Sequence, residues 1–142
     1  MSLTRRDIRE KALQALFQLS ANEGLTIDQA IQQALTSEDE LQDEVEVVEV
    51  PKYLNLVVTG VLQNQAIIDE KIQANLENWS MNRLAKTDLI IMRVAIFEML
   101  YVTDVPGRVA LNEALEITKL YSDEKSRKFV NGVLAKIVDQ EN

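Results

Sequence analysis

Three arginines near the start of the chain have the residue type and spacing that phosphate binding requires. Arg5, Arg6 and Arg9 fall within an arc of about 100° on one side of a predicted helix over residues 4–21. Positive side chains at a helix N-terminus oppose the macrodipole, so helix stability does not account for them. Guanidinium groups bind phosphates through paired hydrogen bonds, which favours contact with a nucleic acid. A solvated helix end with i,i+4 ion pairs is the alternative.

A second basic group lies near the other end of the chain. Lys125, Lys128, Gly132 and Lys136 follow the spacing i, i+3, i+7, i+11, which places them on one face of a helix, and Phe129 flanks that face. Basic residues beside an aromatic ring suit single-stranded nucleic acid. A glycine inside a helix costs about 1 kcal/mol relative to alanine, so another helix or a ligand backbone is expected to approach it closely. A solvated face with a packing glycine is the alternative.

Composition excludes several kinds of chemistry. The chain of 142 residues has no cysteine and no histidine, which removes thiol catalysis, disulfides and the commonest metal ligands. No phosphate-binding glycine loop and no nucleophile–base pair is present, so we expect neither an enzyme nor a cofactor or metal site. No apolar run reaches the length of a membrane span or a signal peptide, and a cytoplasmic setting fits.

The net charge of −8 is unevenly distributed. The stretch 37–50 holds seven of the 23 acidic residues and no basic one, so the rest of the chain has 16 acidic against 15 basic residues. The stretch also lacks the spacing of a calcium-binding loop. We therefore expect an acidic linker and, outside it, local charge patches that matter more than the total.

Long segments without glycine or proline predict an all-α fold. A possible capping box at Thr26 and Gln29, Pro51 as a first helical residue and Thr87 as an N-cap mark helix starts. Gly60 is expected to mark a close helix contact. The predicted helices cover residues 4–21, 26–35, 51–76, 81–85, 87–102, 109–121 and 126–138. We expect two helical subdomains, 1–78 with the linker and 79–142.

The last forty residues carry a family resemblance. "DVPGRVALNEALEITKLYSDEKSRKFVNGVLAKI" closely resembles the C-terminal signature of the NusB family of transcription antitermination factors. "LAKTDLIIMRVAIFEML" is similar to the family's central helix, and "RRDIREKALQALF" to its arginine-rich first helix. The resemblance implies a NusB-like fold of about seven helices in two bundle subdomains. It also implies binding of boxA RNA in ribosomal RNA leader transcripts together with NusE, and assembly with RNA polymerase and other Nus factors against termination.

The resemblance also implies roles for particular residues. The RNA-contacting residues are expected to be Arg5, Arg6, Arg9, Lys125, Arg127, Lys128 and Phe129. The surface that receives NusE is expected to include Phe17, Asp88 and Arg93. Asp7 interrupts the basic run that family members often carry, which suggests that RNA binding depends more on NusE. The resemblance leaves monomer and homodimer both open.

Two other functions remain as alternatives. A helical module that binds only proteins would leave its basic residues as solvated side chains. NusB-like domains also occur fused to ribosomal RNA methyltransferases, but such a protein needs a further α/β domain with a glycine-rich loop, which this chain does not contain.

Overall fold

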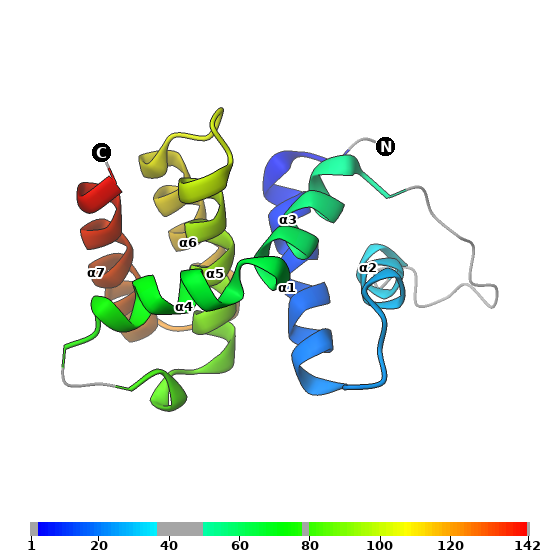
Figure 1. Cartoon of the computed structure of the whole chain (residues 1–142), viewed down its shortest axis with the longest axis horizontal. Coiled ribbons are helices and arrows are strands. Elements are labelled where there is room, and N and C mark those ends of the chain that lie inside the picture. Colours follow the sequence, from blue (N-terminus) through cyan, green and yellow to red (C-terminus); the bar gives the residue numbers. More distant parts are fainter. Residues whose placement is uncertain (1–2, 37–49, 78–79, 142) are drawn as a thin grey trace. The chain divides into compact units, whose positions relative to one another are not determined.

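The computed structural model describes residues 3–36, 50–77 and 80–141, and over these residues the chain is helical without a strand. The helices are α1 (Arg5–Ala21), α2 (Ile27–Thr36), α3 (Lys52–Gln63), α4 (Gln65–Ala74), α5 (Lys86–Tyr101), α6 (Gly107–Tyr121) and α7 (Glu124–Glu141), with a 3₁₀ turn η1 (Met81–Arg83) before α5 (Figure 1). The all-α prediction is confirmed. Most of the predicted acidic linker, residues 37–49, lies outside the described residues.

The chain divides into two compact units, Met1–Thr59 and Gly60–Asn142. The sequence-based boundary after residue 78 stays a prediction. In the first unit α1 packs against α2, and each supplies apolar side chains at helical spacing. The buried residues of these two helices include Ile8, Ala12 and Leu16 from α1 and Ala30, Ile31 and Ala34 from α2.

Capping boxes fix the starts of α1 and α2. The backbone N–H of Asp7 donates to Thr4 Oγ1, and the backbone N–H of Thr4 donates to Asp7 Oδ2, both at 3.0 Å. The predicted box at the start of α2 is confirmed, because Thr26 and Gln29 exchange the same two hydrogen bonds at 2.9 and 3.1 Å. Asp7 therefore has a structural role that the sequence analysis missed, although Thr4 at the helix start was the available signal.

Replacement of Asp7 by alanine is expected to lower the unfolding temperature at pH 7. The backbone N–H of Thr4 holds the pKa of Asp7 below its usual value of 3.8, so the folded state favours the charged form. That contribution is complete above pH 3.8 and is lost as the pH falls through the lowered pKa. Thermal unfolding of the alanine variant and of the unaltered protein should be followed from pH 7 to pH 2.5. The difference between their unfolding temperatures should become smaller in acid. Asp7→Asn, which keeps an acceptor, is the control, and an alanine variant as stable as the unaltered protein at pH 7 contradicts the capping role.

The predicted continuous helix over 51–76 is wrong, because α3 ends at Gln63 and α4 begins at Gln65. The break lies at Asn64, whose side-chain N–H donates to the carbonyl oxygen of Gly60 at 2.8 Å. Asn64 has φ −110° and ψ 14°, outside the helical region, so the helix is interrupted there although the backbone N–H of Asn64 still donates to the Gly60 carbonyl at 3.0 Å. Pro51 lies one residue before α3 rather than in it, and its carbonyl accepts from Asn55 at 3.3 Å.

In the second unit α5 is the central helix, packed against α4, α6 and α7 (Figure 1). It is buried almost all round, as its apolar sequence predicted. The close contact expected at Gly60 is confirmed, because a Cβ there would lie 2.2 Å from Cε1 of Phe97. Phe97 is 3% exposed and stacks on Tyr101 with 5.5 Å between ring centroids.

Other helix ends differ from the sequence-based bounds. Thr87 is not an N-cap, because α5 begins at Lys86 and Ala85 occupies the cap position without a side-chain bond. The expected helix over 81–85 is a 3₁₀ turn of three residues. The structure also extends α6 back to Gly107, and α7 at both ends.

Candidate nucleic-acid interface

The second basic group lies exposed along α7 and begins in the first turn of the helix. The backbone N–H of Ser126 donates to Asp123 Oδ1 at 2.8 Å, which fixes where the helix begins and holds the pKa of Asp123 below its usual value. With the start fixed in this way, Lys125 and Lys128 are exposed and Phe129 is half-buried beside them. Two ammonium groups therefore lie next to one partly accessible aromatic ring.

Arg127 is less exposed than these two lysines. Its residue is half-buried, and its Nε is buried without a hydrogen-bond partner among the described residues. A buried donor without a partner is costly, and this burial distinguishes Arg127 from the two exposed lysines.

A hollow of about 160 Å³ opens beside Phe129. Its lining is mostly apolar, with Leu84 and Ala85 from the segment between η1 and α5 facing Phe129. Cationic side chains at the hollow come from Arg83 and Lys125. A flat apolar group with a phosphate attached fits this combination, since the ring can stack on Phe129 while the cations bind the phosphate. Arg83 was missed by the sequence analysis, and a lone arginine in a short turn gave no signal there.

Asp88 lines the same hollow, so the structure brings together predicted RNA-binding and predicted partner-binding residues. It is the third residue of α5, is 5% exposed and accepts a hydrogen bond from Ser122 Oγ at 3.1 Å. A carboxylate in the first turn of a helix is favourable because of the macrodipole. The Ser122 bond links the start of α5 to the residue after α6 and orients the carboxylate.

Arg93 is engaged inside the second unit. Its Nε and Nη2 donate to the two carboxylate oxygens of Asp69 at 2.9 and 3.0 Å, a bidentate pair that joins α5 to α4. The side chains of Arg93 and Asp69 are 14% and 25% exposed. The structure thus gives Arg93 a structural role, and its contact with a partner stays a prediction.

The predicted basic face of α1 is smaller than expected. Arg5 and Arg6 are exposed, and the Arg5 guanidinium carbon lies 3.8 Å from the centroid of the Tyr53 ring. Arg9 is only 5% exposed. Phe17, at 39% exposed, is available to a partner as the sequence analysis requires.

The burial of Arg9 has a simple geometric cause. Ala12, Leu13 and Leu16 follow Arg9 at i+3, i+4 and i+7, and all three are buried. Arg9 therefore shares their face of α1, where the aliphatic stem can pack among apolar neighbours. The expectation of one exposed arc of three arginines is corrected to two exposed arginines and a buried one.

The described residues contain no group of three or more His, Cys, Asp or Glu side chains that could hold a metal ion. Within the same ranges, none of the helices combines the length and apolar character needed to cross a membrane.

The sequence is similar to a known protein family over most of its length. The family model described as the NusB family matches residues 6–139. A transcription antitermination protein NusB of Lactiplantibacillus plantarum is 55% identical over 139 residues, covering 97% of this chain and 96% of the relative. The Enterococcus faecalis protein of the same name is 56% identical over 140 residues, covering 97% of this chain and 91% of the relative.

Solved structures share the fold. Thermotoga maritima NusB superposes with a TM-score of 0.81 at 32% identity, over 99% of this chain and 94% of the other. A structure of the antitermination factors NusB and NusE in complex with dsRNA superposes with a TM-score of 0.77 over 96% of each chain. Its identity of 22% supports a common fold and no more.

Proposed function

This chain belongs to the NusB family, and we propose that it binds boxA RNA of ribosomal RNA leader transcripts together with NusE. In this role it helps RNA polymerase, with other Nus factors, to resist termination in the cytoplasm. The observation that carries the RNA part is the apolar hollow beside Phe129 with Lys125 and Arg83 on its lining. The protein acts by binding rather than by catalysis.

In RNA binding, the two basic groups have different proposed roles. At α7, Lys125 and Lys128 bind phosphates, while Phe129 and the hollow accept a base from the single strand. Arg5 and Arg6 on α1 add phosphate contacts. Arg127 joins the α7 contact, and Arg9 supports α1 from its buried position.

The partner side rests on an exposed aromatic residue and on one buried carboxylate. Phe17 leaves 39% of its surface accessible on α1, a large apolar group of the kind that anchors protein interfaces. Asp88 lies in the hollow that also contains Lys125 and Phe129. NusE contact at Asp88 would therefore lie next to the proposed RNA site, which supports joint binding of NusE and RNA.

Titration of single-stranded boxA RNA, with and without NusE, at several salt concentrations tests the proposal. About four to six phosphate contacts on a single strand predict that log K falls with log salt at a slope near −3 to −4. A scrambled single strand and a boxA duplex are the RNA controls. A flat salt dependence, or equal binding of boxA and scrambled RNA in the presence of NusE, would contradict the proposed function.

A further inference from the structure

Phe129 also lines a second hollow. We call it the Gly132 groove, a space of about 230 Å³ lined by α7 and by the segment 75–77 that follows α4. Its lining includes Gly132 and Phe129, with Lys128 and Lys136 on α7 and Glu77 opposite. Because Phe129 lines both hollows, the groove continues the proposed RNA site along α7.

Gly132 has no packing role that accounts for a glycine in the middle of an 18-residue helix. Among the residues that the structure describes, no atom lies within 4 Å of a Cβ built on it, and the residue is exposed. Gly60 differs sharply, since Phe97 fills the place of its Cβ. Glycine weakens a helix interior relative to alanine, so close approach by something outside the chain is the remaining physical use for it.

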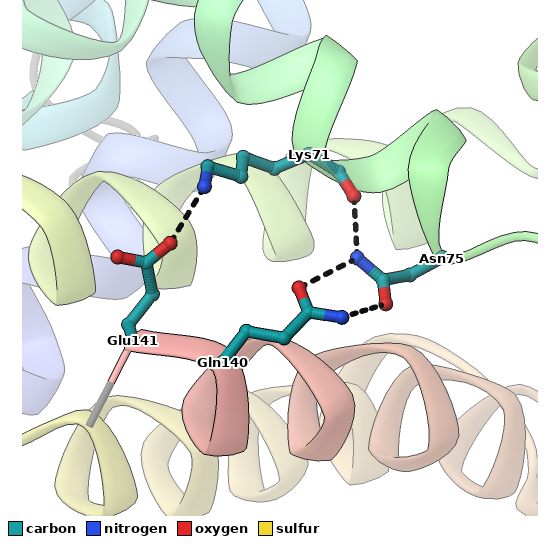
Figure 2. Close-up of polar contacts among 4 residues, drawn as sticks. All are labelled: Lys71, Asn75, Gln140 and Glu141. Carbon is teal, nitrogen blue, oxygen red and sulfur yellow. Dashed lines mark hydrogen bonds and ion pairs between the residues drawn. The ribbon is translucent and has the colours of Figure 1, made fainter.

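The walls of the Gly132 groove are held in place by polar contacts between α4 and α7 (Figure 2). Asn75, which is 7% exposed, receives a hydrogen bond from Gln140 Nε2 at 3.0 Å and donates one back at 3.4 Å. Its Nδ2 also donates to the carbonyl oxygen of Lys71 at 2.8 Å, and Lys71 pairs with Glu141 at 2.6 Å. The groove is therefore formed before a ligand arrives, which lowers the entropic cost of binding.

The charges along the Gly132 groove suit a phosphate backbone. Lys128, Gly132 and Lys136 follow one another at intervals of four residues, so the two ammonium groups bracket the glycine on one line of α7. Lys136 pairs with Glu77 at 3.1 Å, but the Glu77 side chain is 82% exposed. Such an exposed pair is weak, and a phosphate can replace the carboxylate as the partner of Lys136.

We propose that the single-stranded RNA continues past Phe129 into the Gly132 groove, where its sugar–phosphate backbone lies directly against α7 at Gly132. This inference rests on the proposed function and extends its RNA path. Lys128 and Lys136 bind the phosphates on either side of the close approach. Gly132 is thus an RNA-contact position because it lacks a side chain.

Substitution of Gly132 by alanine separates this role from a structural one, because the two properties should change in opposite directions. The added methyl group meets open space in the free protein, so the unfolding temperature should rise by about 3 °C. In the complex the same methyl group prevents the close approach, so affinity for boxA RNA with NusE should fall about tenfold. Asn131→Ala is the matched control, since it improves helix propensity at the neighbouring exposed position without adding an atom to the groove.

A second variant tests the phosphate contact. Lys136→Gln should reduce the salt slope of boxA binding by about 0.7, while Lys119→Gln on α6 should leave it unchanged. A Gly132→Ala protein that binds RNA as tightly as the unaltered protein, or an unchanged slope for Lys136→Gln, overturns the extended path alone. Absence of RNA binding by the unaltered protein with NusE overturns the proposed function and this inference together.

Discussion

Reversal of charge at both Lys125 and Lys128 is expected to weaken boxA RNA binding by about 100-fold at low salt. Each substitution removes a proposed phosphate contact and adds a repulsive carboxylate, and about 1.4 kcal/mol per site corresponds to about tenfold each. The magnitude of the salt slope should fall by about 1.4, because two fewer counterions are released on binding to a single strand. Both side chains are exposed, so the unfolding temperature should change little. Gel shifts of the double variant with NusE at several salt concentrations measure both effects.

Lys119→Glu is the matched control for the single variant Lys128→Glu. Lys119 is exposed on α6 and pairs with Glu116 at 3.2 Å, a surface contact of small energetic value. Both substitutions change the net charge equally, so a general electrostatic effect would weaken RNA binding in both. We expect the loss in Lys128→Glu alone, and equal losses would contradict a local phosphate site.

The double charge reversal also distinguishes the proposed function from a module that binds only proteins. Calorimetric titration with NusE should give the same affinity for the double variant as for the unaltered protein, because neither lysine is proposed to contact NusE. If boxA binding by the NusE complex also survives, the basic residues of α7 are solvated side chains and the protein-binding alternative is favoured.

The helices were predictable because apolar periodicity reports directly on which face is buried. The break between α3 and α4 was not, since the apolar stripe continues through it: Val57, Val61, Ile68 and Ile72 are all buried. A single residue, Asn64, separates the two helices, and its non-helical backbone (φ −110°, ψ 14°) leaves no trace in periodicity. Thr87 gave a wrong helix start, because a residue type that favours the N-cap position lies here inside the first turn of α5. The helix begins at Lys86 without a side-chain cap.

The candidate site was predictable only in part, because side-chain burial depends on neighbours that spacing does not show. The spacing of the three arginines of α1 shows only that they share an arc, whereas the burial of Arg9 follows from the apolar positions that share its face of the helix. The pair between Arg93 and Asp69 joins residues on two helices and could not be read from either. Asp88, Lys125 and Phe129 share a hollow only because the fold brings the starts of α5 and α7 together.

Alanine at Gly60 is expected to have the largest effect on stability. Its Cβ would lie 2.2 and 2.3 Å from Cε1 and Cζ of Phe97, closer than any real contact, so the ring must move. The ring is 3% exposed and stacked on Tyr101, which leaves it little room. Overpacking of this kind costs about 1–3 kcal/mol, and the gain in helix propensity of about 1 kcal/mol offsets only part of it. Thermal and urea unfolding should therefore show a less stable protein.

The same substitution at Gly132 is the matched comparison, because both glycines lie inside helices but only Gly60 has a neighbour in the place of its Cβ. Opposite signs for the two alanine variants would assign the loss at Gly60 to the Phe97 contact rather than to the backbone. Phe97→Leu provides the second half of a double-mutant cycle: it destabilises by itself but makes room for the new methyl group, so the double variant should lose less stability than the sum of the two changes. Additive losses, or a Gly60→Ala protein as stable as the unaltered one, would contradict the contact, since the ring would then have space that the structure does not give it.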